Sequence, residues 1–289
     1  MTQREAVQIH SDNLAEFRRR KALVSDQHAL SLRLLIEELL LEELSPTMLY
    51  REFCKLLSTP SPYDKALFCQ RLFSVQKREE EAPDHAGNGG EDSVRAGAHG
   101  TVALVRNRYN DEAFSLFSHT LIGAKRSYYP SFTDVCDSVV DGWSEFCLLP
   151  LENTQNGRLF GFYSMMDRYE LKICAATETD VEGPQGRTRY ALVGRSLPER
   201  IPKNSLWNFE CSVVTESDRF PSDILQVAPI LGAKLLKIDT LPVQYNEDSH
   251  RIYFTFRTSE EEAAAFDFYL TDEHRSYATI GLYPVIRNI

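Results

Sequence analysis

Two short polar runs, each beside an apolar segment, could carry chemistry in this chain. Glu152-Asn153-Thr154 follows one apolar segment, and Thr188-Arg189 precedes another. Their carboxylate, amide, hydroxyl and guanidinium groups could bind a small polar molecule or donate a hydrogen bond to it. Without further context, the first run is also typical of a turn or cap at a strand end. The second, which follows two glycines, is also typical of a surface turn.

Other kinds of active site find no support in the sequence. It contains no phosphate-binding loop, no zinc signature and no nucleophile elbow. His119 is a lone histidine on an amphipathic segment, which we interpret as structural. The basic run 18–21 is interpreted as a solvated helix face. We therefore expect no metal and no cofactor.

Charge and composition restrict the partners and the compartment. The formal charge of −10, from 32 basic and 42 acidic residues, argues against nucleic acid or an anionic membrane as the main partner. The first residues lack the apolar core of a signal peptide, and glutamates interrupt the apolar stretch 34–44. The six cysteines form no Cys-x-x-Cys pair. We interpret them as buried, reduced thiols and expect a cytoplasmic location.

The first part of the chain, residues 1–78, is predicted to be a helical region. Leucines at three-to-four spacing between residues 30 and 44 indicate an amphipathic helix that needs a packing partner. Ser45-Pro46 and Ser61-Pro62 predict that two further helices begin near residues 46 and 62. Residues 79–100 are rich in glycine, alanine and charge, so we expect a flexible linker that leaves the helical region independent.

The rest of the chain is predicted to form two mixed units. Strands alternate with helices over residues 101–200, which indicates a small parallel α/β lobe in which Ser131 or Thr133 opens a helix. Residues 203–289 have the order βαββαβ, a ferredoxin-like α+β pattern. In this unit Ser259 and Glu262 predict a capping box, and Pro229 should shorten or kink the first helix.

Four motifs occur in an order that resembles the prephenate dehydratases. The run 148–154, which reads LLPLENT and precedes Gly157, resembles their strand-end motif, and the run 188–190 resembles their Thr-Arg-Phe signature. The runs 236–242 and 280–285 resemble landmarks of the ACT regulatory domain attached to those enzymes. The resemblance covers about residues 101–286. It implies half of a periplasmic-binding-protein-like dehydratase domain, followed by an ACT domain.

The resemblance also implies roles for individual residues. Thr188 would donate a hydrogen bond to the hydroxyl that leaves prephenate, Arg189 would help to position the site, and residues 152–154 would line the substrate side of the lobe. In the ACT part, effector binding is implied at Ser222, Asp223, Ile224, Asp239 and Thr240.

The sequence departs from the family pattern in two informative ways. The interval from Pro150 to Thr188 is 188 − 150 = 38 residues, and a helix and a strand already occupy most of it. That interval leaves no room for the second lobe of the family's substrate cleft. In the ACT part, Ser222-Asp223-Ile224 stands where the family usually has Gly-Ala-Leu, so the phenylalanine site is altered.

Three hypotheses follow. The first is a degenerate, non-catalytic binding or regulatory protein of L-phenylalanine metabolism that forms a homodimer through its ACT domain and binds a small aromatic acid or amino acid. The second is an active dehydratase, converting prephenate to phenylpyruvate, water and carbon dioxide, whose cleft is completed by a partner chain or by the N-terminal region. In the third, the helical region is a chorismate-mutase module. The sequence leaves open whether the chain is an enzyme.

Overall fold

The computed structural model describes residues 26–80, 100–118, 121, 123–179, 186–197, 207–216, 221–243 and 246–286. Most of the predicted linker (residues 81–99), His119 and the basic run 18–21 lie outside these residues. No helix in the described ranges is long and apolar enough to cross a membrane. All six cysteines are free thiols; five are buried as predicted, and Cys54 is half-buried.

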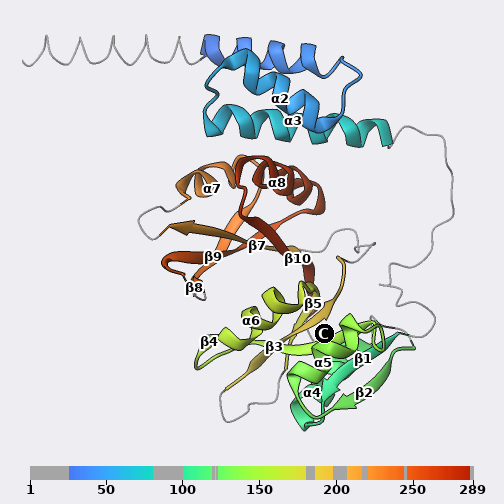
Figure 1. The fold of residues 1–289 in the computed structure, drawn as a ribbon. Coiled ribbons are helices and arrows are strands. Elements are labelled where there is room, and N and C mark those ends of the chain that lie inside the picture. The colour runs from blue at the N-terminus through green and yellow to red at the C-terminus, as the bar shows by residue number, and fades with distance from the viewer. Residues whose placement is uncertain are drawn as a thin grey trace, which may run out of the picture.

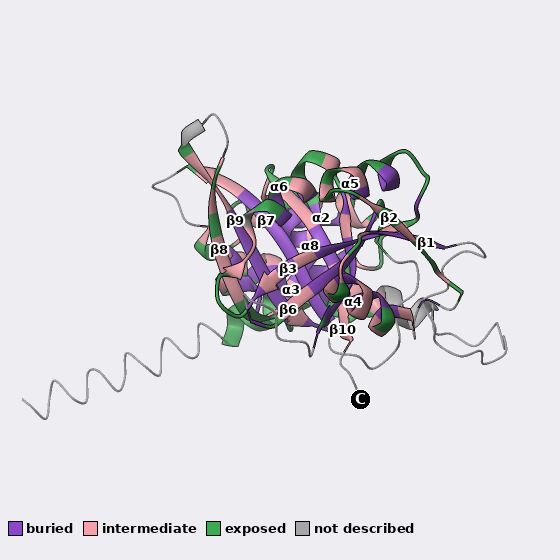
Figure 2. Cartoon of the chain, turned by 90° about the horizontal axis from the view of Figure 1, so that it is seen from below, coloured by how far each residue is buried: buried purple, intermediate pink, exposed green. Residues whose placement is uncertain are grey.

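One sheet of ten strands runs through the molecule (Figure 1). Its strands are β1 (Thr101–Val105), β2 (Lys125–Tyr129), β3 (Phe146–Asn153), β4 (Gly157–Arg158), β5 (Lys172–Glu178), β6 (Thr188–Gly194), β7 (Trp207–Glu216), β8 (Lys234–Val243), β9 (Asn246–Thr258) and β10 (Tyr277–Ile286). Their order is β2-β1-β3-β6-β5-β10-β7-β9-β8, and β4 pairs with β3. Figure 2 shows the middle of this sheet buried, whereas β8 at its edge is half-buried or exposed.

The lobe at one end of the sheet is mixed, not parallel as predicted. The strands β2, β1 and β3 are parallel, but β6 is antiparallel to both β3 and β5. The physical reason is the short connection between β5 and β6, because parallel neighbours need a crossover of about a dozen residues or more. The helices of this lobe are α4 (Arg108–Ser118), α5 (Phe132–Val140) and α6 (Phe160–Tyr169). Of the two predicted candidates, Ser131 caps α5, accepting a hydrogen bond from the Asp134 backbone, whereas Thr133 lies within the helix.

The C-terminal unit, residues 207–286, has the predicted βαββαβ order. Its helices are α7 (Ser222–Val227) and α8 (Glu260–Glu273), and its strands follow the antiparallel order β10-β7-β9-β8. The predicted capping box of Ser259 and Glu262 opens α8. The first helix ends at Val227, two residues before Pro229, which agrees with the expected shortening.

The lobe and the C-terminal unit are joined edge to edge by β5 and β10. These strands are parallel, and Gly281 lies opposite Ile173. A Cβ atom on Gly281 would lie 2.8 Å from the Ile173 carbonyl oxygen, so only glycine allows this close approach. The outer edge of β10 is thus already paired within the chain.

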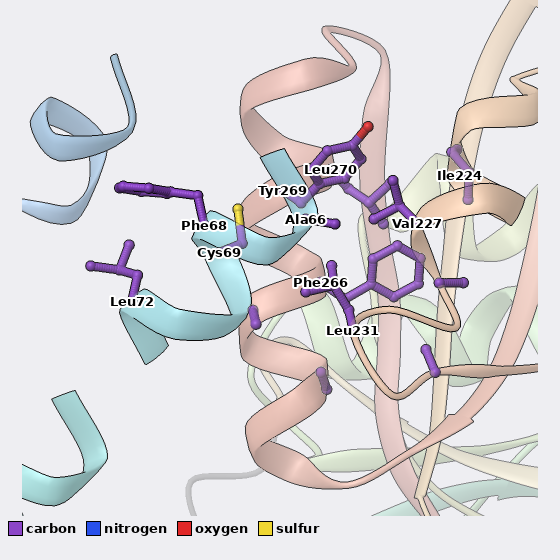
Figure 3. Packing of buried hydrophobic residues seen from close by; sticks show 14 of the residues in the cluster. Ala66, Phe68, Cys69, Leu72, Ile224, Val227, Leu231, Phe266, Tyr269 and Leu270 are labelled. Atoms are coloured by element: carbon purple, nitrogen blue, oxygen red, sulfur yellow. The ribbon is translucent and has the colours of Figure 1, made fainter. Parts of the chain in front are cut away.

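The N-terminal helices form a layer over α7 and α8 (Figure 1). A helix covers residues 26–39, and α2 (Pro46–Leu57) and α3 (Pro62–Glu80) begin where the sequence predicted. One apolar cluster contains Phe53 and Phe68 from this layer together with Phe266 from α8. In Figure 3, Ala66 of α3 lies beside Tyr269 and Leu270 of α8. The helical region therefore shares a core with the C-terminal unit, and the expectation of an independent helical unit is wrong.

Candidate functional site

The strands β3 and β6 bring the two predicted polar runs together. In their antiparallel register Glu152 lies opposite Arg189, and Asn153 lies opposite Thr188. The carboxyl ends of the parallel strands β1, β2 and β3 lie at this edge of the sheet, which is where open α/β sheets usually bind ligands. The sequence therefore selected residues that are neighbours in space.

The carboxylate of Glu152 is surrounded by three cations. Its Oε1 accepts a hydrogen bond from Nη1 of Arg189 at 2.5 Å, and its Oε2 accepts one from Nζ of Lys237 at 3.3 Å. The Nε atom of Arg158 lies 4.0 Å from Oε2. Lys237 belongs to β8 of the C-terminal unit, so this carboxylate links the lobe to that unit.

Asn153 and Thr154 stabilise turns. The Oδ1 atom of the buried Asn153 accepts hydrogen bonds from the backbone of Gln155 at 3.2 Å and of Asn156 at 2.7 Å. The Thr154 hydroxyl accepts one from the Arg187 backbone at 3.1 Å. These contacts match the turn interpretation of the run.

Thr188 and Arg189 differ in how they are held. The hydroxyl and the backbone N–H of Thr179 both donate to the Thr188 carbonyl at 3.1 Å, whereas the Thr188 side chain has no hydrogen-bond partner among the described residues. Arg189 is paired with Glu152 and lies 3.5 Å from the Glu178 carboxylate. The candidate donor is thus available, but the candidate positioning cation is already neutralised.

A buried arginine that sequence reasoning missed lies at the centre of this arrangement. The Arg158 side chain is 8% exposed, and its Nη1 donates to Oε1 of Glu210 at 2.5 Å. Its Nε lies 2.8 Å from Oδ2 of Asp239, and its Nη2 donates to the Thr255 hydroxyl. Three strands of the C-terminal unit therefore hold an arginine that comes from the lobe.

The carboxylate of Glu210 is completely buried and fully engaged. Besides Arg158, it accepts hydrogen bonds from the hydroxyl of Tyr163 at 2.5 Å and from that of Tyr283 at 2.7 Å. Burial raises the pKa of Tyr283 well above its usual value, and the Glu210 carboxylate raises it further. The tyrosine therefore remains a neutral donor.

The charge of Arg158 is maintained by its neighbours. Burial lowers the pKa of Arg158, but the carboxylates of Glu210, Asp239 and Glu152 outweigh burial, and the net pKa is raised. We call the residues Glu152, Arg158, Arg189, Glu210, Lys237 and Asp239 the ionic network. One sequence signal could have indicated it: Glu210 is the only acid in the apolar run 206–214, and a carboxylate buried in such a strand needs a cation.

The predicted effector residues do not form a single site. Ile224 is completely buried in the core, and Thr240 is exposed on β8. Asp239 belongs to the ionic network. Ser222 is exposed at the start of α7, beside Asp223, and Asp223 lines a surface hollow of about 370 Å³ together with His274.

The carboxylate of Asp223 is paired within this hollow. Its Oδ2 lies 2.9 Å from Nε2 of His274 and accepts a 3.4 Å hydrogen bond from the Tyr269 hydroxyl. Burial raises the pKa of Asp223, but the hydrogen bond and charge of His274 outweigh burial, and the net pKa is lowered. The hollow therefore presents an ionised carboxylate beside an imidazole.

Comparison with known proteins identifies the fold. No protein-family model matches the chain, and no curated protein matches it. Among solved structures, a prephenate dehydratase from Streptococcus mutans matches with a TM-score of 0.53 and 19% identity, over 65% of this chain and 100% of that chain. The chain has a prephenate-dehydratase-like fold.

Two further solved structures resemble this fold. The quorum-quenching acylase GqqA matches with a TM-score of 0.50 and 15% identity, over 64% of this chain and 94% of that chain. The prephenate dehydratase from Arthrobacter aurescens, solved in complex with L-Phe, has a TM-score of 0.48 and 14% identity, over 64% and 90% of the two chains. Because GqqA is described as an acylase, the prephenate-dehydratase-like fold alone does not determine a reaction.

Proposed function

We propose that the chain is a non-catalytic binding or regulatory protein of aromatic amino acid metabolism, built from a partial dehydratase lobe and an ACT-like C-terminal unit. The observation that carries this proposal is the ionic network. The residues that would meet a substrate on the lobe, Glu152 and Arg189, are occupied by each other and by Lys237 of the C-terminal unit. The hollow that Asp223 lines supports a ligand-binding role for that unit.

The chemistry of prephenate explains why the occupied edge matters. Loss of carbon dioxide and hydroxide needs a hydrogen-bond donor at the departing oxygen and free cations for two carboxylates. Here Arg189 and Lys237 both contact Glu152, and Arg158 is paired with Glu210. A substrate carboxylate would have to displace these partners.

The short interval between β3 and β6 is a second support for this proposal. Only β4, α6 and β5 lie between β3 and β6 among the described residues, so this interval supplies no second α/β lobe. Positioning between two walls can contribute about 7–11 kcal/mol to lowering a reaction barrier. The Thr188 hydroxyl alone cannot replace it.

We expect the purified full chain to convert prephenate to phenylpyruvate no faster than buffer does. Thr188→Ala should leave this baseline unchanged, because the hydroxyl has no positioned substrate to act on. Phenylpyruvate absorbance in alkali measures the product, and circular dichroism checks that the variant is folded. Turnover above the buffer rate that is lost in Thr188→Ala would instead support the active dehydratase, with its cleft completed by a partner chain.

We also propose that β8 mediates a homodimer by pairing with β8 of a second copy. In the C-terminal unit, β10 is paired with β5 of the lobe, whereas the outer side of β8 has no paired strand in the part of the chain that the structure describes. Leu235 and Leu236 on this strand are 37% and 42% exposed. A free strand edge that carries apolar side chains favours pairing with another chain.

The dimer can be tested by placing a charge on this edge. Leu236→Lys should convert the dimer to a monomer, since lysine on an edge strand opposes edge-to-edge pairing. Light scattering after size-exclusion chromatography measures the mass. Leu56→Lys, which changes a 56% exposed leucine on α2, is the control and should remain dimeric. A wild-type chain that is monomeric at micromolar concentration would refute the proposal.

A further inference from the structure

A hollow in the N-terminal helical layer has the size and lining of a small-molecule site. It lies between the helix over residues 26–39 and α3, and its volume is about 330 Å³. Its apolar walls are Ala29, Leu32, Ile36 and Leu67. Small-molecule sites usually have volumes of about 300–1,000 Å³ and mainly apolar walls. The size and the lining of this hollow fit a compact apolar group.

Two of the three polar side chains in the hollow are already engaged. The amide of Gln70 donates a 2.9 Å hydrogen bond to the Ile230 carbonyl at the end of α7. Arg71 is paired with Glu37, which accepts from its Nε at 2.9 Å and its Nη2 at 2.5 Å. These contacts hold both side chains in place and neutralise one of the two guanidinium groups in the hollow.

The third polar side chain, Arg33, lines the same hollow without such a partner. Among the described residues, no carboxylate pairs with its guanidinium, and Glu37 one turn later on the same helix is paired with Arg71. Within the described ranges, the hollow therefore carries one exposed guanidinium, that of Arg33, that is paired with no carboxylate and lies beside apolar walls. A planar guanidinium with a free face is suited to bind a carboxylate through two parallel hydrogen bonds.

We propose that this hollow binds a small monocarboxylate with an apolar body, aromatic or branched. Arg33 binds the carboxylate, and the body packs on Leu32, Ile36 and Leu67. A dianion such as a phosphate monoester fits less well, because the second charge would have no cation and would meet Glu37. An ammonium ligand would be repelled by Arg33. This site is separate from the hollow at Asp223 and from the edge that carries Thr188, so it does not depend on the function proposed above.

The proposal can be tested on the full chain with 3-phenylpropionate as the probe and calorimetry or ligand-detected NMR as the measurement. We expect saturable binding of the acid, at least about tenfold weaker binding of the neutral analogue 3-phenyl-1-propanol, and at least about tenfold weaker binding of the acid to Arg33→Gln. Arg51→Gln removes an exposed arginine from α2, outside the hollow, and should bind as the wild type does.

A second variant tests the apolar part. Ala29→Phe keeps Arg33 and places a ring over the walls, so it should also abolish binding. Circular dichroism checks that each variant is folded. The proposal is overturned if the wild type shows no saturable binding at millimolar acid, if the alcohol binds as tightly as the acid, or if Arg33→Gln binds unchanged. Loss of binding in Ala29→Phe and Arg33→Gln, with Arg51→Gln unaffected, supports it whether or not the chain turns over prephenate.

Discussion

Replacing Arg158 with methionine is expected to lower the free energy of unfolding by about 3–5 kcal/mol. The change keeps much of the side-chain volume but leaves the Glu210 carboxylate, which is 0% exposed, without its cation. Asp239 also loses the partner that lies 2.8 Å away. A buried charge that loses its partner retains its desolvation cost without the compensating attraction. Denaturant unfolding followed by tryptophan fluorescence measures the loss, because Trp207 is buried in β7.

Two controls separate the ionic network from a general effect of removing an arginine. In the double variant Arg158→Met, Glu210→Gln, most of the lost stability should return, because the neutral amide no longer needs a cation. Arg126→Met removes a pair with Asp111 whose side chains are 43% and 35% exposed, so it should cost no more than about 1 kcal/mol. An equal cost for Arg158→Met and Arg126→Met would mean that the network does not hold the lobe to the C-terminal unit.

Local signals predicted the elements well, because each depends on neighbours in the sequence. Ser131 and Ser259 are followed three residues later by acids whose backbone N–H groups they cap, and both helices begin where these patterns indicated. The turn chemistry of Asn153 likewise depends only on the next three residues. Such features need no knowledge of the rest of the fold.

The ionic network could not be predicted in the same way. Arg158 and Glu210 are separated by 52 positions, and they meet only because β5 pairs with β10 and brings the two units into one sheet. Nothing in the sequence near either residue specifies that pairing. The mixed lobe has the same origin, since the direction of β6 depends on its connection to β5 and not on its own residues. The pairing of β5 with β10, which are far apart in the sequence, therefore determines which residues meet at the candidate site.

The N-terminal helical layer combines a local feature that the sequence predicted with a tertiary contact that it did not. The leucine spacing indicated an amphipathic helix that needs a partner, but the predicted apolar face was largely wrong. Leu30, Leu34 and Leu41 are exposed, and the helix buries Leu32, Ile36 and Leu39 instead. The sequence could not indicate that α3 would in turn pack on α8, because an apolar helix face does not specify which element covers it. An acid on the α3 surface that faces α8 tests how strongly the two units are coupled.

Ala66→Glu is expected to detach the helical layer from the C-terminal unit. Ala66 is completely buried on α3 in the cluster that includes Phe266 and Leu270 of α8 (Figure 3). An unpaired carboxylate there would cost several kcal/mol, roughly the whole stability that such an interface provides. Separating the two layers is therefore expected to cost less free energy than burying the carboxylate. Hydrogen exchange should show protection lost over residues 46–75, while β3 and β6 remain protected.

The control is Ser74→Glu, which adds the same charge on an exposed position of α3 and should leave protection unchanged. Two hydrogen bonds to Glu273 on α8 make the test stringent, because the Tyr50 hydroxyl donates to it at 2.9 Å and Lys65 donates to its other oxygen. If these polar contacts and not the apolar core hold the layers together, Ala66→Glu will keep full protection of α2 and α3. That result would show that the helices dock through Glu273, and Glu273→Gln would then detach them where Ala66→Glu had not.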